Sequence, residues 1–282
     1  MKRYRIALIV VMASLILIFG FAYLSPGPYS DKVVVLMYHH LSPGEETSAT
    51  ISPETFTKHM EMLRDEGFNV IPIQALGKFL DGLEGVPPNA VVITFDDGYE
   101  SVYEYGYPIL KEYGYPATVF MIVSRIGRKE GEIPKLTWEQ MLEMQESGIS
   151  FHNHSYDGHY KVAVNQNGKL KPVLAGEIFD FTTNTKESRE ARQQRVYQDL
   201  KLAKEILEKG LEHPVEFFAA PYGVYDEVTI EAARQAGIRY IFNIKSGAIK
   251  KTTDPVHLNR VNAGSPNISA EDLKRSIFKA AR

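Results

Sequence analysis

The chain has 282 residues, of which 44% are hydrophobic and 24% charged, and this ordinary globular composition excludes disorder and collagen-like structure. Its 32 basic and 35 acidic side chains give a formal net charge of −3, which argues against general nucleic-acid binding because phosphate affinity needs an excess of Lys and Arg. The chain has no cysteine, so disulfides, thiol catalysis and cysteine-ligated metals are excluded, and any metal site must use His, Asp and Glu.

The N-terminus has the pattern of a targeting segment. Lys2, Arg3 and Arg5 precede an uncharged run over residues 6–24, which Pro-Gly-Pro then ends. A run of 19 residues is close to the roughly 20 that cross a bilayer and longer than the roughly 7–15 of a cleaved signal core. We therefore expect residues 1–28 to be an uncleaved signal anchor, with a cleaved signal peptide as the alternative. The basic residues keep the N-terminus cytoplasmic, which places residues 29–282 outside the membrane, anchored or secreted.

Residues 29–282 are predicted to form one domain of alternating strands and helices. The first half contains strands at 33–38, 68–71, 90–95, 117–123 and 149–154, a helix that begins at Ser52 and ends at Gly67, and a helix that Thr137 and Gln140 cap. After a polar loop insertion at 160–185 come helices at 187–209 and 227–236, strands at 216–219, 238–244 and 256–261, and a last helix that Ser269 caps. About seven or eight such units favour an α/β fold, a distorted (β/α) barrel of parallel strands that follows the N-terminal apolar segment.

Two adjacent carboxylates, Asp96 and Asp97, follow the strand at 90–95 and precede Gly98. In a parallel barrel the carboxyl ends of the strands converge, so active sites form there. A turn at Gly98 can bring both carboxylates into one pocket, where their repulsion raises one pKa unless a cation intervenes. A metal on one carboxylate would leave the other free to act as a base. The alternative is an ordinary solvated turn.

Three of the eight histidines, His152, His154 and His159, fall within eight residues around the end of the strand at 149–154. On a helix His154 and His159 would face apart, but a turn between them lets the two rings converge. Neutral imidazoles with a carboxylate leave open positions for water and substrate, as in a catalytic metal site. His152 shares a strand face with His154 and is the rival ligand. A polar loop with chance histidines is the alternative.

Two further strand ends carry candidate groups. His39 follows the first strand and could donate or accept a proton in the pocket, or be a buried hydrogen-bonded histidine. The turn Pro221-Tyr222-Gly223 follows the strand at 216–219 and could aim a backbone N–H at a developing oxyanion. Such tripeptides are in most cases simple turns.

Three motifs stand in a fixed order along the chain: Thr94-Phe-Asp-Asp-Gly98, His154-Ser-Tyr-Asp-Gly-His159 and Phe218-Ala-Ala-Pro-Tyr-Gly223. Together they resemble the polysaccharide deacetylases of the NodB-homology, carbohydrate esterase 4 type, and the resemblance spans residues 33–261. The early Met-Tyr-His-His at 37–40, the helix start at 136–140 and the long insertion look most like the branch that de-N-acetylates poly-β-1,6-N-acetylglucosamine of biofilms.

The resemblance implies that Asp97, His154 and His159 bind one divalent metal ion, expected to be zinc, and that Asp96 is the general base. It implies a hydrolase that removes N-acetyl groups from an extracellular N-acetylglucosamine polymer, expected to be poly-β-1,6-N-acetylglucosamine. The backbone N–H of Tyr222 would support the oxyanion, and His39 would have a substrate or acid role. Tyrosines near the expected mouth are candidates to stack on sugar faces: Tyr99, Tyr156, Tyr222 and Tyr225.

Two departures from the family pattern bear on the chemistry. Many relatives carry an Arg that orients the catalytic Asp where this chain has Ala219, so we expect Asp96 to be a poorer base. The usual late Leu-x-His that supplies the general acid is missing, and His257, at the wrong offset, is interpreted as structural. The alternatives are a peptidoglycan or chitooligosaccharide deacetylase, and a non-catalytic glycan-binding relative that kept the fold.

Overall fold

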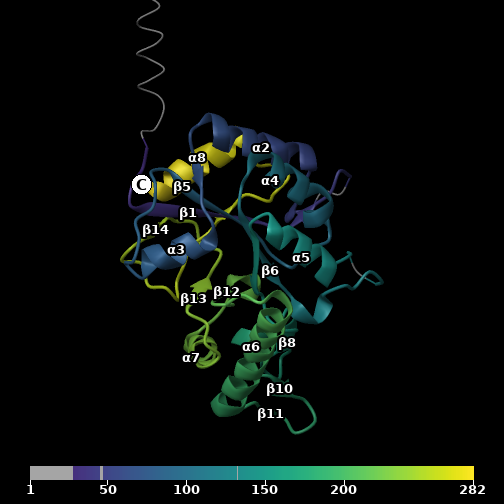
Figure 1. Cartoon of the computed structure of the whole chain (residues 1–282). Helices are drawn as coiled ribbons and strands as arrows, with labels where there is room; N and C mark the ends of the chain where they lie inside the picture. The colour runs from purple at the N-terminus through teal and green to yellow at the C-terminus, as the bar shows by residue number, and fades with distance from the viewer. Residues whose placement is uncertain (1–27, 45–46, 132) are drawn as a thin grey trace, which may run out of the picture.

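The computed structural model describes residues 28–44, 47–131 and 133–282. The expected anchor or signal peptide at 1–28 lies outside the described residues, apart from its last position. Within the described part, no helix is both long enough and apolar enough to cross a membrane. This part is built around one curled sheet of nine strands with helices on its outer side (Figure 1).

The main sheet has the order β13-β12-β7-β6-β5-β1-β14, with β15 also beside β1 and β4 also beside β5. Its strands are β1 (Lys32–Tyr38), β4 (Asn69–Val70), β5 (Ala90–Phe95), β6 (Ala117–Met121), β7 (Ile149–Asn153), β12 (Phe217–Ala219), β13 (Tyr240–Phe242), β14 (Ile249–Lys250) and β15 (Val261–Asn262). Neighbours pair in parallel except β14, which is antiparallel to β1. The parallel α/β barrel is thus confirmed, whereas β14, only two residues long, is too short to leave a sequence pattern.

One segment near the C-terminus, residues 258–262, links the two edges of the curled sheet, and we call it the closing segment. Leu258 forms a parallel bridge with Phe242 of β13, and Val261 pairs in parallel with β1. Arg260 lies between these two contacts and is fully buried. The barrel is therefore closed by one bridge to β13 and a two-residue pairing with β1, rather than by the longer strand predicted at 256–261.

The two faces of the sheet have different partners because successive strand side chains point to opposite sides. Val33, Val35 and Val92 belong to an inner cluster, which α3 (Ile73–Leu80) completes with Leu76 and other apolar side chains. The alternate residues of the same strands belong to an outer cluster with side chains of the surrounding helices. The inner side is thus apolar at the amino ends of the strands, which leaves the carboxyl ends for polar groups.

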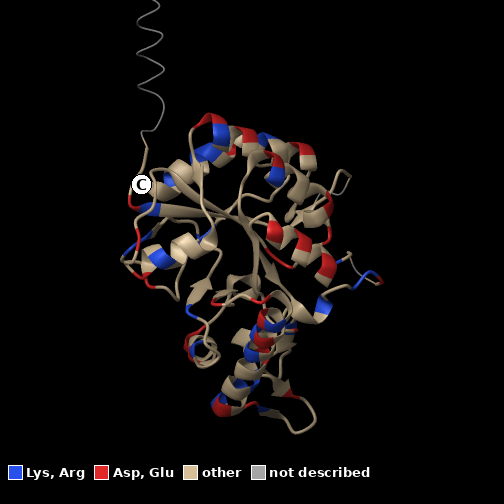
Figure 2. Cartoon of the chain, viewed as in Figure 1, with Lys and Arg blue, Asp and Glu red and all other residues tan. Residues whose placement is uncertain are grey.

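Six further helices surround the sheet. They are α2 (Pro53–Asp65), α4 (Tyr107–Tyr113), α5 (Trp138–Glu146), α6 (Arg189–Leu211), α7 (Glu227–Gln235) and α8 (Ala270–Ala281). The predicted caps are confirmed: Ser52 accepts from the backbone N–H of Thr55, and Thr137 and Ser269 each form a capping box. Both blue and red residues occur along α2 and α6 in Figure 2, so neither helix presents a face of a single charge.

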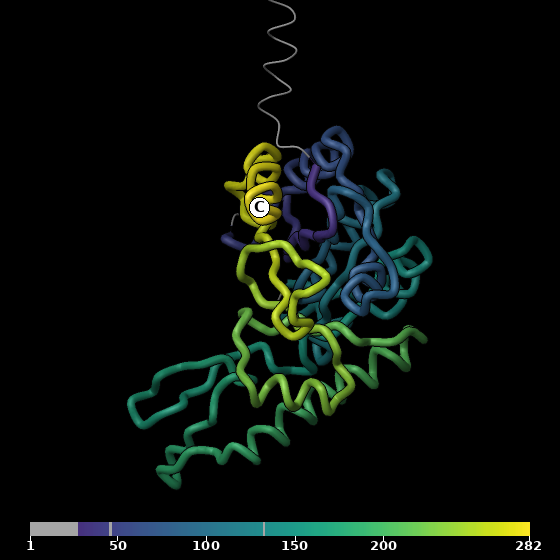
Figure 3. Tube along the Cα trace, turned by 90° about the vertical axis from the view of Figure 1, so that its left-hand side faces the viewer, coloured from purple at the N-terminus to yellow at the C-terminus, as the bar shows by residue number. Residues whose placement is uncertain are grey.

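The insertion predicted as a polar loop at 160–185 contains two short antiparallel hairpins. The first pairs β8 (Lys161–Ala163) with β9 (Leu170–Pro172), and the second pairs β10 (Phe179–Asp180) with β11 (Thr185–Lys186). In Figure 3 these hairpins extend from the body of the barrel alongside α6. Strands of two or three residues are too short for an alternating pattern, so the sequence reads as irregular here.

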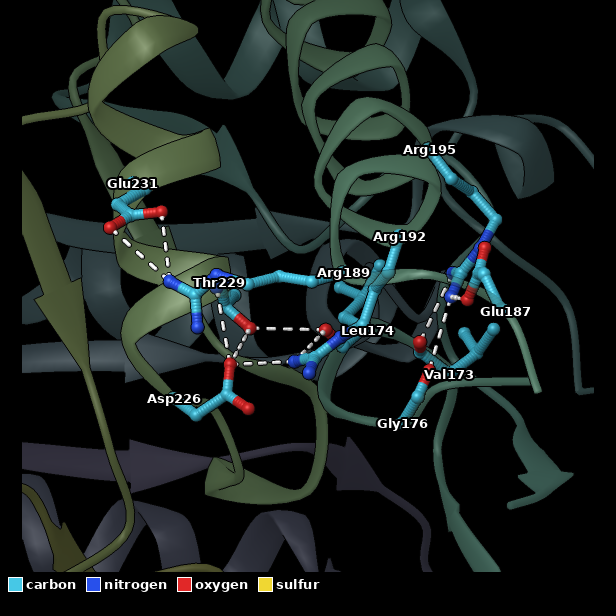
Figure 4. A network of polar contacts seen from close by, with 10 residues as sticks. All are labelled: Val173, Leu174, Gly176, Glu187, Arg189, Arg192, Arg195, Asp226, Thr229 and Glu231. Carbon is cyan, nitrogen blue, oxygen red and sulfur yellow. Dashed lines mark hydrogen bonds and ion pairs between the residues drawn. The ribbon is translucent and has the colours of Figure 1, made fainter. Parts of the chain in front are cut away.

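Arginines of α6 hold the insertion in place (Figure 4). The guanidinium of Arg195 donates to the carbonyls of Val173 and Gly176 and pairs with the Glu187 carboxylate. Arg192, which is buried, donates to the carbonyl of Leu174 and to Asp226. These backbone carbonyls thus accept hydrogen bonds from arginine side chains instead of from a neighbouring strand. Such pairings between distant residues cannot be predicted from the sequence.

His59 on α2 is fully buried and joins three elements of the outer layer. Its Nδ1 lies 3.0 Å from the Tyr38 hydroxyl and its Nε2 lies 2.9 Å from the carbonyl oxygen of Ile268. The carbonyl can only accept, so Nε2 carries the proton and Nδ1 accepts from Tyr38. Burial lowers the pKa of His59 to about 4, although the hydrogen bond to Ile268 acts in the opposite direction. The folded state therefore holds a neutral imidazole.

This buried imidazole predicts a pH-dependent stability. Below pH ~6.5 the unfolded chain binds a proton at His59, whereas the folded chain binds one there only near pH ~4. The free energy of unfolding therefore decreases as the pH falls through this window, by at most about 3 kcal/mol. In His59→Gln we expect lower stability at pH 7 and the loss of this part of the pH dependence. Urea unfolding at pH 7, 6, 5 and 4.5 would measure both, with His257→Gln at the surface as control. Equal pH slopes in wild type and His59→Gln would contradict the assignment.

Candidate active site

The candidate groups gather at the carboxyl ends of neighbouring strands, as the sequence predicts. Asp96 and Asp97 directly follow β5, His154 directly follows β7, and His39 directly follows β1. The turn that contains Tyr222 comes two residues after β12. Because all these strands are parallel, their ends meet at one mouth of the barrel.

Asp97, His154 and His159 form a compact cluster. Oδ1 of Asp97 lies 3.3 Å from Nε2 of His154 and 3.3 Å from Nε2 of His159. These three atoms all lie within 4.8 Å of one another. Among the described residues, this is the one group of His, Asp and Glu side chains close enough together to hold a metal ion. The turn after β7 therefore brings the two histidines together, as predicted. His152 is not part of the cluster, because it packs against Phe217 and the ring of His213 instead.

Ala219 fixes the orientation of the His154 ring through its backbone. The Nδ1–H of His154 donates to the carbonyl oxygen of Ala219 over 2.7 Å, since a carbonyl can only accept. A neutral ring held in this way has its free electron pair on Nε2, which faces Asp97. A hydrogen bond from the far nitrogen is the usual means by which proteins orient a metal-binding histidine.

Three non-glycine residues at the site have left-handed backbone conformations, with φ of 70° at Asp97, 80° at Ser155 and 60° at Tyr222. Such conformations persist only where neighbouring groups impose them, and they concentrate at functional sites. Gly98 is left-handed as well, and an added Cβ would lie 2.6 Å from Cε of Met121, so only glycine fits without displacing it. The backbone is thus shaped to aim the ligand side chains.

The turn between the two histidines is held by side chains on both sides. The amide oxygen of Asn153 accepts from the backbone N–H of Ser155, and the Ser155 hydroxyl accepts from that of Gly158. The carboxylate of Asp199 on α6 accepts from the backbone N–H groups of Tyr156 and Asp157, at 3.0 and 2.9 Å. Sequence reasoning missed Asp199, because nothing in a helical Gln-Asp-Leu distinguishes it from a solvated acid.

The protonation states are set by burial and by close charges. Burial raises the pKa of Asp97, but its contact with His154 and the neighbouring imidazoles outweigh this effect and hold the pKa well below its usual range. Burial lowers the pKa of His159 to about 4, so this ring is neutral. Burial also disfavours the charged form of His154, yet the two aspartates raise its pKa overall. A cation bound here would therefore compete with a proton for Nε2 of His154.

The cluster fits a divalent metal ion. Oδ1 of Asp97 is buried and accepts no hydrogen bond from any described residue, although two imidazole nitrogens face it at 3.3 Å. Leaving a buried carboxylate oxygen without a partner is costly. One carboxylate oxygen and two imidazole nitrogens are a donor set that zinc and similar ions accept, with positions left for water and substrate.

Asp96 has a separate partner. Nη1 and Nη2 of Arg260 donate to Oδ1 and Oδ2 of Asp96 over 2.7 and 2.8 Å, and both side chains are almost completely buried. Arg260 Nε donates in addition to the backbone carbonyl of Asn243. Burial raises the pKa of Asp96, but Arg260 and the nearby histidines lower it overall, so the group is an ionised carboxylate. His39 Nε2 lies 3.8 Å from Oδ2 of Asp96.

The expectation that Asp96 lacks an orienting arginine is therefore wrong. The closing segment supplies the guanidinium, because Arg260 holds both carboxylate oxygens of Asp96. An arginine inside the apolar strand pattern predicted at 256–261 was the available signal, because a charge in such a run needs a buried partner. What the sequence does not show is that the partner lies 164 positions earlier.

Tyr222 packs against the Asp97–His154–His159 cluster through His159. Its ring centroid lies 4.5 Å from that of His159, and its hydroxyl donates to the backbone carbonyl of His159. Lys161 of β8 lies over the Tyr222 ring, with its Nζ 5.1 Å from the ring centroid. The predicted role of the Tyr222 backbone N–H remains a prediction, whereas its side chain is shown to contact a cluster residue.

A family model described as polysaccharide deacetylase matches residues 84–241. The chain belongs to this family. A Bacillus subtilis protein provisionally named as the polysaccharide deacetylase YxkH is 30% identical over 238 residues, 84% of this chain and 73% of its own. A poly-β-1,6-N-acetyl-D-glucosamine N-deacetylase of Staphylococcus aureus is 24% identical over 80% of this chain and 71% of its own. A de-N-acetylase structure from Aggregatibacter actinomycetemcomitans superposes with a TM-score of 0.78 at 26% identity, over 87% of this chain and all of that one.

These comparisons confirm the predicted family and the predicted enzyme class, a hydrolase of amide bonds in polysaccharides. The match at 84–241 includes Asp96, Asp97, both clustered histidines and Tyr222. It excludes His39 and Arg260, which the fold brings to the same mouth from the two ends of the described chain.

Metal binding can be tested without any substrate. Asp97→Asn removes the shared carboxylate oxygen at constant volume, so we expect the affinity for Zn²⁺ to fall at least about 100-fold by isothermal titration calorimetry. Because His154 must lose a proton to bind, wild-type affinity should rise with pH, and the heats should depend on the ionisation enthalpy of the buffer. Asp65→Asn, an exposed acid of α2, is the control. Unchanged zinc affinity in Asp97→Asn would show that the cluster is not the metal site.

Proposed function

We propose that the protein is a metal-dependent N-deacetylase of an extracellular N-acetylglucosamine polymer, with poly-β-1,6-N-acetylglucosamine as the substrate and zinc as the metal. The observation that carries this proposal is the division between two adjacent carboxylates. Asp97 faces two imidazole nitrogens, while Asp96 is held by Arg260 and lies near His39. A binding protein has no need for this separation, but hydrolysis needs both a cation site and a free base.

Asp97, His154 and His159 would hold the ion through Oδ1 and the two Nε2 atoms that already face one another. A divalent ion there would polarise the acetamide carbonyl and make a water molecule more acidic. The ring orientation imposed by Ala219 and the low pKa of His159 keep both imidazoles available as ligands. Zinc is favoured by the mixed nitrogen and oxygen donors and by the room for further ligands.

Asp96 would act as the general base. Its carboxylate is ionised and held by two hydrogen bonds, so it can accept a proton from the attacking water without changing its position. Arg260 acts through Asp96 as a positioning residue. His39 lies near the same carboxylate, with its Nε2 3.8 Å from Oδ2, and would give a proton to the departing glucosamine nitrogen.

The charge on the substrate oxygen would be stabilised by the backbone N–H of Tyr222 as well as by the ion. The side chain of Tyr222, about one third exposed beside His159, would border the bound sugar. Acetate and a free amine would leave. Chitooligosaccharides and peptidoglycan carry the same acetamide, so they are the alternative substrates of the same chemistry.

The choice of polymer is supported by the relatives, since the Staphylococcus aureus protein is named as a poly-β-1,6-N-acetyl-D-glucosamine N-deacetylase. The cellular location is supported by the sequence alone. Basic residues followed by an uncharged run at 6–24 would anchor the chain in the membrane, with the catalytic part outside the cytoplasm, or direct its secretion if the segment is cleaved.

Released acetate is the direct test of the proposed reaction. We expect the zinc-loaded protein to release acetate from poly-β-1,6-N-acetylglucosamine, and Asp96→Asn to lower the rate about 10²- to 10⁴-fold while zinc binding persists. Chitin oligomers and peptidoglycan run in parallel identify a different glycan if one is preferred. Zinc-loaded wild type that releases no acetate from any of the three would contradict deacetylation and favour glycan binding.

The role of Arg260 predicts a change in pH dependence. Arg260→Lys keeps a positive charge but loses the paired geometry, so we expect kcat/KM to fall about 10- to 100-fold. Since Arg260 lowers the pKa of Asp96, weakening the pair should move the acidic limb of the kcat/KM profile to higher pH. Arg239→Lys, an exposed arginine in ion pairs with Asp81 and Glu216, is the matched control. An unmoved acidic limb in Arg260→Lys would argue against Asp96 as the base.

A further inference from the structure

A cavity opens next to the turn that contains Tyr222, beyond the carboxyl ends of β12 and β13. Its volume is about 340 Å³, and residues from three stretches line it: 223–225, then 243 and 245, then 257 and 259. Gly223 directly follows Tyr222, whose ring contacts the metal cluster. Asn243, another lining residue, accepts a hydrogen bond from Arg260 through its backbone carbonyl, and Arg260 in turn holds Asp96. The cavity is therefore a structural neighbour of both halves of the catalytic site.

The side chains of this cavity suit a sugar ring. Tyr225 and His257 lie nearly parallel, with their ring centroids 5.8 Å apart and an interplanar angle of 18°. The Tyr225 hydroxyl donates to the backbone carbonyl of Val256, at 2.8 Å, and lies 3.1 Å from Nδ1 of His257, so the aromatic wall is fixed. His257 is therefore exposed at a cavity, and the interpretation of it as structural is incomplete.

Two asparagines, Asn243 and Asn259, also line the cavity. Asn243 is buried and its oxygen accepts from the backbone N–H of Lys245 over 2.6 Å. Asn259 lies against Gly247, where an added Cβ would come within 2.6 Å of its Nδ2, so the glycine leaves room for this amide. Fixed aromatic rings with a few placed amides are the composition by which proteins bind small polar rings.

An exposed apolar strip joins this cavity to the catalytic mouth. Tyr222, Val224 and Ile244 have 36%, 44% and 49% of their surface exposed. Gly223 lies beneath Ile244, since an added Cβ would meet Cγ1 of Ile244 at 2.5 Å. An apolar strip between two polar pockets fits a chain of sugars, whose CH faces pack on apolar side chains while their hydroxyl groups reach the pockets.

Lys245 gives the cavity a charge that distinguishes substrate from product. Among the described residues that line the cavity, Lys245 is the one with a permanent charge. Asp254 nearby does not line the cavity, and its carboxylate accepts from the backbone N–H of Val256. A sugar that keeps its acetyl group is neutral, whereas a deacetylated unit carries an ammonium group that a lysine repels.

We propose that this cavity binds the sugar unit next to the one being deacetylated, and that Lys245 makes it select a neighbour that still carries its acetyl group. This inference rests on the proposed function, because it assumes a polymeric N-acetylglucosamine substrate. Its consequence is a pattern: the enzyme works poorly beside a unit that is already deacetylated, so free amines are spread along the polymer instead of gathering in blocks.

The test uses the zinc-loaded full-length protein and three β-1,6-linked disaccharides, one with both acetyl groups and two with a single acetyl group on either unit. We expect kcat/KM for one of the singly acetylated isomers to be roughly fivefold below the doubly acetylated compound. Lys245→Met should reduce this difference to less than about twofold, and Lys245→Arg should keep it. Asn259→Ala should raise KM for the doubly acetylated compound, whose second unit occupies the cavity. Hydrolysis of 4-nitrophenyl acetate, which is too small to reach the cavity, should be unchanged in each variant.

The outcomes separate the two proposals. Wild type that hydrolyses the small ester but releases no acetate from any disaccharide or from the polymer would overturn the proposed substrate, and the neighbouring-sugar site with it. Wild type that deacetylates the disaccharides, with the same isomer preference in Lys245→Met or an unchanged KM in Asn259→Ala, would overturn the neighbouring-sugar site alone. Loss of the preference in Lys245→Met, with Lys245→Arg like wild type, would support it.

Discussion

The pairing of Arg260 with Asp96 is the constraint on which the rest of the site depends. Both groups are withdrawn from water, which is costly unless the geometry is good and the remaining donors are satisfied. Here two parallel hydrogen bonds join the groups, and a third ties the guanidinium to Asn243. This neutralises one of two adjacent carboxylates, so that its neighbour Asp97 can face the histidines alone. One contact thus gives the two adjacent carboxylates different surroundings and ties the closing segment to the end of β5.

The backbone around the cation site is shaped by its surroundings and not by local preference. Asp97, Ser155 and Tyr222 all adopt conformations that a non-glycine residue disfavours. Each belongs to a turn that begins at or shortly after a buried parallel strand, where the sheet leaves the chain little freedom. Side chains then complete the restraint: Asn153 and Asp199 hold the turn between the histidines. Local strain of this kind is compensated by the packed barrel beneath, and it keeps the ligands in place before any ion binds.

Sequence reasoning recovered what local patterns determine. The strand at 90–95 agrees with β5 residue for residue because a fully buried β-branched run ends at Asp-Asp-Gly, and Ser52, Thr137 and Ser269 mark their helices by capping chemistry. The clustered residues were found from motif order and spacing. Features that depend on distant partners were missed: β14, the hairpins of the insertion, the acceptor role of Asp199, and above all Arg260. From the sequence, Arg260 is a charged residue in a predicted strand, and its partner Asp96 can be identified only from the fold.

Arg260 also makes the two halves of the site depend on different parts of the chain. The clustered Asp97, His154 and His159 are held by turns that follow β5 and β7, whereas the partner of Asp96 comes from the closing segment. The closing segment is joined to the sheet by few backbone pairings, so the buried ion pair with Asp96 is a large part of what holds it there. A displacement of this segment would leave the Asp97–His154–His159 cluster in place and would change the charge and orientation of Asp96 alone.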